Sequence, residues 1–66
     1  MAIWHFIYDG EGHEGYIKAT HSRQDAISKF KRTKGYFRPP NGFKIEKTSF
    51  KNLSEIPADN TLEVIK

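Results

Sequence analysis

The chain has 66 residues, no cysteine and a net charge of +3 at neutral pH. A chain this short has a small core, and without cysteine it has neither a disulfide nor a thiolate metal ligand to stabilise it. Its apolar runs are too short for a membrane span, and its first residues lack the features of a signal peptide. We therefore expect one compact domain over residues 1–66, soluble and cytoplasmic, with no role in the membrane.

The first twenty residues predict a β-hairpin. Residues 3–8 are rich in β-branched and aromatic side chains, as is typical of a strand. Asp9 opens a glycine-rich turn. Residues 16–20 then alternate, with Ile17 and Ala19 on one face, which indicates a second strand that pairs with the first.

The next segment predicts one helix of about three turns. Ser22 is a favourable N-cap, and Asp25 places a negative charge near the positive end of the helix dipole. Ala26 and Phe30 lie four residues apart and share one face. Gly35 follows a cluster of cations and is a typical C-terminal stop.

Two further strands are expected after the helix. Residues 36–42 contain two prolines and an Asn-Gly pair, which favour a rigid turn. Residues 43–50 alternate as a strand, and residues 61–65 predict a short last strand with Leu62 and Val64 facing inward. The sequence thus predicts an α+β fold of β-β-α-β-β order, with a small, mainly antiparallel sheet and a single helix packed on one face.

The register of the first hairpin decides which side chains are exposed. If Phe6 pairs with Ile17, then Trp4, Phe6 and Tyr8 enter the core. If Ile7 pairs with Ile17, these aromatics form an exposed platform on which unpaired bases would stack. We expect the first register, because a small domain needs its bulkiest side chains inside. Either register leaves a candidate second binding surface, made of Tyr16, Lys18, Lys44 and Lys47.

Charge is strongly segregated along the chain. Ten of the eleven Lys and Arg residues lie between Lys18 and Lys51, where only Asp25 and Glu46 oppose them, so this stretch carries +8. A field of one sign attracts an oppositely charged partner. The residues expected to contact an acidic partner or a nucleic acid are Arg23, Lys29, Lys31, Arg32, Lys34 and Arg38.

Neither a metal site nor a catalytic site is expected. His5, His13 and His21 lie eight residues apart and do not converge in the predicted hairpin, whereas a zinc site needs three or four converging ligands. The sequence has no cysteine nucleophile, no glycine-flanked serine and no phosphate-binding loop. We therefore expect a protein that is not an enzyme and that needs no cofactor.

These features favour a non-enzymatic binding module whose basic helix and turn dock on a polyanion, most of all nucleic acid or a nucleoprotein. No motif that reads a base sequence is present. In size and element order the chain is loosely similar to small phage-encoded proteins with one helix on a short sheet, some of which inhibit host defence complexes. That similarity implies the alternative, a phage-type inhibitor or adaptor that binds an acidic surface of a host protein. A homodimer through the uncovered sheet face is a weaker alternative.

Overall fold

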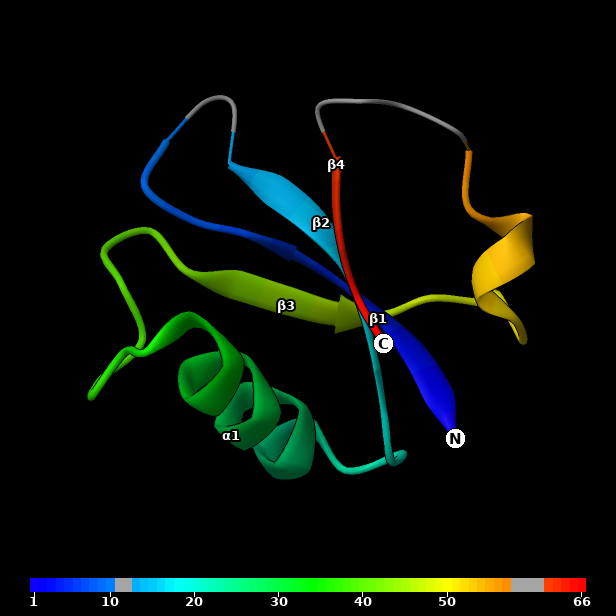
Figure 1. The fold of residues 1–66 in the computed structure, drawn as a ribbon, viewed down its shortest axis with the longest axis horizontal. Helices are drawn as coiled ribbons and strands as arrows, with labels where there is room; N and C mark the ends of the chain where they lie inside the picture. The colour runs from blue at the N-terminus through cyan, green and yellow to red at the C-terminus, as the bar shows by residue number, and fades with distance from the viewer. Residues whose placement is uncertain (11–12, 58–61) are drawn as a thin grey trace.

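The structure, a computed structural model, describes residues 1–10, 13–57 and 62–66. Its elements in chain order are β1 (Ala2–Ile7), β2 (Glu14–Ala19), α1 (Arg23–Lys34), β3 (Lys44–Lys47), the short 3-10 helix η1 (Leu53–Glu55) and β4 (Leu62–Ile65). α1 lies on one side of the sheet and η1 on the other (Figure 1). The prediction of a small α+β fold with one α-helix is confirmed.

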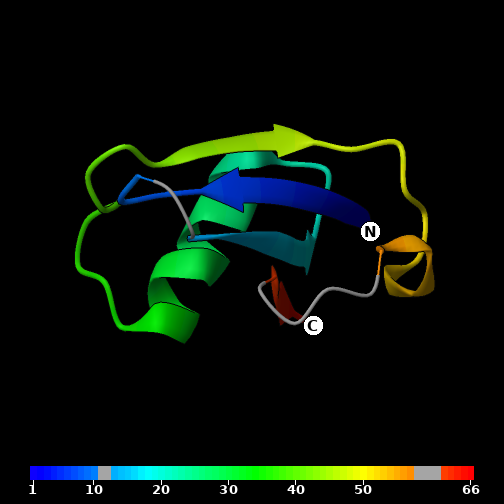
Figure 2. The ribbon, with the colours of Figure 1, turned by 90° about the horizontal axis from the view of Figure 1, so that it is seen from above.

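The sheet is mixed, which corrects the prediction of a mainly antiparallel sheet. Its strand order is β3-β1-β2-β4, as Figure 2 shows with the strands in front of α1. β1 is antiparallel to both β2 and β3, but β4 runs parallel to β2. A parallel pair requires a long connection, and here α1, β3 and η1 supply it. Alternation of side chains reveals a strand but not its direction, so the sequence did not show this pairing.

The first hairpin buries its aromatics, as expected, but the predicted pairing of Phe6 with Ile17 is wrong by two residues. A shift of two residues keeps the same side chains on the same face, so the buried face is unchanged. Trp4 lies opposite Ile17 and Phe6 opposite Gly15, so these residues all face α1. Trp4, Phe6 and Tyr8 are only 4%, 0% and 5% exposed, which excludes an aromatic platform on the sheet surface. The core between the sheet and the helix consists of Ala2, Trp4, Phe6, Tyr8, Ile17, Ala19, Ala26, Phe30, Ile45 and Ile65.

The predicted signals at both ends of α1 are present. The Ser22 hydroxyl accepts a hydrogen bond from the Asp25 backbone N–H at 3.4 Å, and Gly35 ends the helix with φ of 80°. Phe30 packs against Phe6 with 4.9 Å between ring centroids, which fixes the helix on the sheet. Among the described residues, no helix has the length and hydrophobicity that crossing a membrane requires.

β4 buries the face opposite to the one that the sequence predicts. Leu62 and Val64 were expected inward, but Val64 pairs with Tyr16 on the face away from the helix and is 44% exposed. Ile65 is buried instead, and Glu63 lies on the helix side. The inward prediction is wrong because Glu63 finds polar partners beneath the helix that the sequence did not reveal.

The segment that follows β3 covers part of the second sheet face. Ile3 points away from α1, yet it is only 1% exposed. The Thr48 backbone N–H and hydroxyl both donate to the Ile3 carbonyl oxygen, at 2.9 and 2.7 Å. The Phe50 ring then lies edge-on to Tyr16, with 5.8 Å between centroids. The sheet face expected to be open is therefore partly closed by the chain itself.

Candidate functional site

The expected cationic surface is carried by α1 and the loop after it. Five of the six predicted residues belong to α1, and Arg38 follows in the loop. Three of the cations, Lys31, Arg32 and Lys34, lie in the last turn, where the helix dipole favours positive charge. Arg23, Arg32 and Arg38 are exposed to solvent. The structure therefore places the predicted cations along one helix and its exit, although they do not all point the same way.

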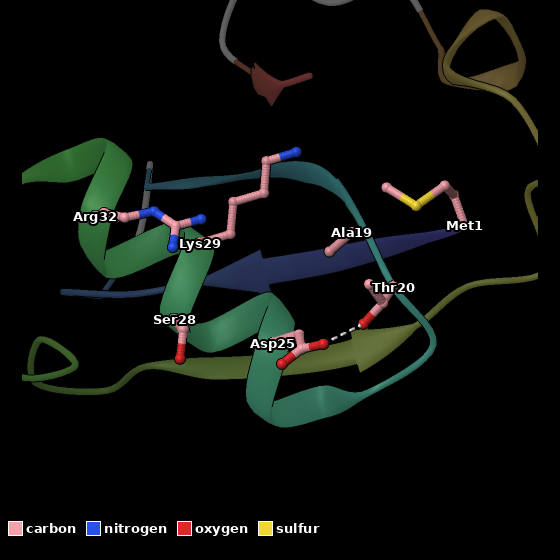
Figure 3. Close-up of a pocket in the computed structure, with 7 residues that line it drawn as sticks. All are labelled: Met1, Ala19, Thr20, Asp25, Ser28, Lys29 and Arg32. Carbon is pink, nitrogen blue, oxygen red and sulfur yellow. Dashed lines mark hydrogen bonds between the residues drawn. The ribbon is translucent and has the colours of Figure 1, made fainter.

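Lys29 and Arg32 lie beside a shallow pocket between α1 and the end of β2. The pocket has a volume of about 220 Å³, and Figure 3 shows these two side chains side by side on α1. Across the pocket, the Thr20 hydroxyl donates to the Asp25 carboxylate at 2.8 Å. Asp25 is thereby occupied by a neutral partner, and the pocket presents two cations at its rim.

Lys29 also has a structural role. Its ammonium group donates a hydrogen bond to the backbone carbonyl oxygen of Lys18 in β2. This bond ties the middle of α1 to β2 at Lys18. The pairing of β2 with β4 ends one residue earlier, at Ile17. The charge of Lys29 remains near the surface, but its position is fixed by the fold.

Lys34 is engaged with an acid of the C-terminal strand. Its Nζ lies 2.5 Å from Oε2 of Glu63, and the Tyr8 hydroxyl donates to Oε1 of the same carboxylate at 2.9 Å. The side chains of Lys34 and Glu63 are 27% and 35% exposed, so water only partly screens the pair. Lys34 is therefore the predicted contact residue whose charge the protein itself already neutralises.

The pKa values in this cluster follow from its contacts. Burial alone would raise the pKa of Glu63, but the hydrogen bonds from Lys34 and Tyr8 outweigh it and lower that pKa. The hydrogen bond to Glu63 raises the pKa of Lys34. Burial raises the pKa of Tyr8, and its hydrogen bond to Glu63 adds to the effect. At neutral pH the carboxylate and the ammonium are both charged and the phenol is neutral.

The other cations of this surface have no acidic partner in the part of the chain that the structure describes. Arg23, Lys31, Arg32 and Arg38 form no ion pair with any carboxylate of residues 1–10, 13–57 and 62–66. Two acids of the flanks are engaged elsewhere. Glu14 pairs with His5 at 2.7 Å, and Oε2 of Glu55 accepts hydrogen bonds from the backbone N–H groups of Lys51 and Asn52.

The candidate second surface is divided between the two faces of the sheet. Tyr16 and Lys18 of β2 face away from the helix, as does Lys44, which pairs with Ile7. Lys47 lies on the helix side instead, with its Nζ 5.3 Å from the centroid of the Trp4 ring. The grouping of Lys47 with the other three is therefore wrong.

Tyr16 is also less available than a surface group would be. The ring of Phe50 lies against one part of it, and the His5 ring lies 5.1 Å from it. Tyr16 is half-buried as a result. This second surface retains Lys18 and Lys44 as its cations, separated by β1.

Two of the three histidines contact neighbouring side chains. His5 pairs with Glu14, and the His13 ring stacks on Tyr8 with 5.1 Å between centroids. Within the described residues, no group of three or more His, Cys, Asp or Glu side chains converges as a metal site would require.

Two features of the surface were missed by sequence reasoning. Phe37 is 91% exposed in the loop after α1, directly before Arg38. Glu63 neutralises Lys34 across 29 residues of sequence. The signal for Phe37 was its place in a proline-containing turn, where core aromatics are uncommon. No local signal joins Glu63 to Lys34.

Comparison with known proteins adds no family to this description. No protein-family model matches the chain, and neither the curated proteins nor the solved structures include one with significant similarity to it.

Proposed function

We propose that this protein is a non-enzymatic binding module that docks α1 and the following loop on a polyanion, most of all nucleic acid or a nucleoprotein. The observation that carries the proposal is the set of cations without acidic partners among the described residues, namely Arg23, Lys31, Arg32 and Arg38. Unpaired cations on one helix and its exit favour the phosphates of a nucleic-acid backbone, which present regularly spaced negative charge.

The contact would position the protein on its partner without reading sequence. Arg32 at the rim of the pocket and Arg38 in the loop supply guanidinium groups, which bind phosphate in a bidentate manner. Gln24 is the only amide side chain on α1, and amides are typical readers of adenine. Each phosphate contact contributes about 0.9 to the slope of log affinity against log salt for duplex DNA and about 0.7 for single strands.

The rival hypothesis is a small phage-type inhibitor that binds an acidic surface of a host protein, such as a defence complex. It would use the same cations, because charge complementarity serves protein partners as well. The two hypotheses differ in what a purified nucleic acid does at low salt. Only the first requires binding in the absence of any protein partner.

A homodimer through the uncovered sheet face has less support than expected. The segment after β3 donates two hydrogen bonds to the Ile3 carbonyl oxygen and packs Phe50 on Tyr16, so the chain already covers part of that face. Val64 remains 44% exposed there. Sedimentation equilibrium tests this alternative, and a monomer at high concentration would exclude it.

The proposal is tested with labelled single-stranded and duplex DNA and RNA at two salt concentrations. The wild-type protein is compared with the double variant R32Q/R38Q and with K44Q/K51Q, which loses the same charge elsewhere. We expect affinity to fall with salt, and R32Q/R38Q to bind more weakly than K44Q/K51Q. Absence of binding at low salt would overturn the proposal, whereas equal losses in both variants would reduce the interaction to net charge alone.

A further inference from the structure

Phe37 is an unusual surface residue in this protein. It is 91% exposed, more than any other large apolar side chain that the structure describes; the next are Met1 at 67% and Val64 at 44%. Single exposed apolar residues are common on protein surfaces and need no function. The case for a function must therefore come from how Phe37 is held and from what surrounds it.

The loop is anchored to the helix on one side of Phe37. The Tyr36 backbone N–H donates to the Lys31 carbonyl oxygen at 2.8 Å. The Tyr36 ring stacks on Phe30 with an interplanar angle of 12° and 5.8 Å between centroids, and it meets the Tyr8 ring edge-on. Tyr36 is thus directed to the core while its neighbour, Phe37, is directed to solvent.

The loop is anchored on the other side as well. The Asp9 backbone N–H donates to the Asn41 carbonyl oxygen at 2.8 Å, and the Phe43 backbone N–H donates to the Pro40 carbonyl oxygen at 3.1 Å. Two consecutive prolines restrict the backbone further. Phe37 is therefore presented by a segment held at both ends, at the opposite end of the molecule from η1 (Figure 2). Preorganisation of this kind lowers the entropy lost on binding.

The segment that carries Phe37 is itself positively charged, although the acidic residue Asp9 contacts its far end through the backbone bond to Asn41. Arg38 follows it and is exposed, and no Asp or Glu occurs between Ala26 and Ile45. An unpaired nucleotide combines a flat apolar face with one negative charge, which matches an exposed ring beside a guanidinium group. In a duplex the faces of the bases are stacked on one another and unavailable to a side chain.

We propose that Phe37 stacks on an unpaired base of single-stranded nucleic acid while Arg38 binds the adjoining phosphate. This inference rests on the proposed function and narrows it to single strands, or to unpaired segments of a folded RNA. The loop would provide base stacking, and α1 would provide the remaining phosphate contacts.

Binding of a short labelled oligothymidine and of a duplex of equal length, both at low salt, tests this inference. Phe37→Ala should weaken oligothymidine binding about tenfold or more and change duplex binding less than about twofold. Phe37→Trp should preserve binding, since a larger ring stacks at least as well. Val64→Ala, which shortens an exposed apolar side chain in β4, is the matched control and should leave both affinities unchanged.

Fluorescence gives a second readout that does not depend on affinity. In Phe37→Trp, oligothymidine should quench the new tryptophan, whereas the buried Trp4 of the wild-type protein should respond little. Trp4 emission also confirms that each variant is folded. A variant that binds oligothymidine without this quenching would contradict stacking at position 37.

The outcomes separate the two proposals. If the wild-type protein binds neither oligonucleotide, the proposed function itself fails. If it binds both and Phe37→Ala binds as well as the wild type, or loses single strand and duplex equally, only the stacking role of Phe37 is overturned. If the affinities of Phe37→Ala for both oligonucleotides equal those of the wild type, the exposed ring would instead serve a contact with a protein partner.

Discussion

Lys34 at the end of α1 and Glu63 in β4 form an ion pair, with Nζ 2.5 Å from Oε2, across 29 residues of sequence. The Tyr8 hydroxyl completes the cluster from just beyond β1. Three separate parts of the chain therefore meet at one carboxylate, and this contact ties the last strand to the helix.

Glu63→Gln should destabilise the protein by about 1 kcal/mol near neutral pH, the usual size of a partly exposed charged hydrogen bond. Because the folded-state pKa of Glu63 is lowered, its contribution is present above the ordinary glutamate pKa of 4.5 and is lost as pH falls through the folded-state value. Urea unfolding followed by Trp4 fluorescence would measure this difference.

The control for this experiment is Glu46→Gln, an exposed change in β3 on the face away from α1. We expect it to alter stability by less than about 0.5 kcal/mol. The difference in unfolding free energy between wild type and Glu63→Gln should shrink as the pH falls below 4.5, and it should close once Glu63 is protonated in the folded state as well. A gap that stays constant from neutral to acid pH would contradict the role given to the charge.

Gly15→Ala should displace β4. A Cβ atom at this position would lie 2.2 Å from the Glu63 carbonyl oxygen and 2.8 Å from Cζ of Phe6. The first of these is backbone held in the parallel pairing, so it cannot move without breaking the sheet. We expect a loss of about 2 kcal/mol or more, with faster amide exchange in β4.

Gly35→Ala is the comparison that separates the cost of a steric clash from the cost of backbone strain. Gly35 has φ of 80° and open space where a Cβ would lie, so alanine there meets only the cost of the left-handed conformation, about 1 kcal/mol. If the two variants lose equal stability, the close approach of β2 and β4 at Gly15 is not the limiting contact.

Phe50→Ala should destabilise the protein although Phe50 lies outside every strand and helix. Its half-buried ring packs on Tyr16, and removing it would expose the covered part of the sheet. We expect a loss of about 1–2 kcal/mol in denaturant unfolding. Phe37→Ala removes the same side chain from an exposed site and should change stability by less than about 0.5 kcal/mol. Equal effects would mean that the segment after β3 does not cover the sheet.

Trp4 fluorescence should be poorly quenched by iodide in the folded protein. The ring is 4% exposed, and its Nε1–H donates to the Thr20 carbonyl oxygen at 2.9 Å. Lys47 lies over the ring and would attract iodide, so neutral acrylamide serves as the control quencher. Both should quench strongly only after unfolding. Strong quenching by both in the native state would contradict the register of the first hairpin.

The sequence was most informative where the signals are local. Ser22 and Gly35 marked the ends of α1, and the need to bury bulky side chains indicated the side to which Trp4 points. Alternation also puts Lys47 on the same face as Phe43 and Ile45, which is the core side, although the prediction grouped Lys47 with Lys44. Such features depend on a few neighbouring residues and on the simple geometry of helices and strands.

What the sequence did not reveal depends on distant pairing. β4 has apolar residues on both of its faces, so alternation alone favours neither Leu62 nor Ile65 as the buried one. The choice is made by Glu63, which becomes favourable beneath the helix only when Lys34 and Tyr8 are already in place. For the same reason, the fraction of the cationic surface that is internally neutralised was not predictable.

The parallel pairing of β2 with β4 has a consequence for folding kinetics. It joins Glu14 to Leu62, so its formation must close a loop of 62 − 14 = 48 residues out of 66, whereas β1 and β2 pair through a short turn. Such a non-local pairing is expected to form after the transition state, once the hairpin and helix have met. Changes at Glu63 should then accelerate unfolding while leaving the folding rate almost unchanged, so that β4 sets the lifetime of the native state more than the speed at which it is reached.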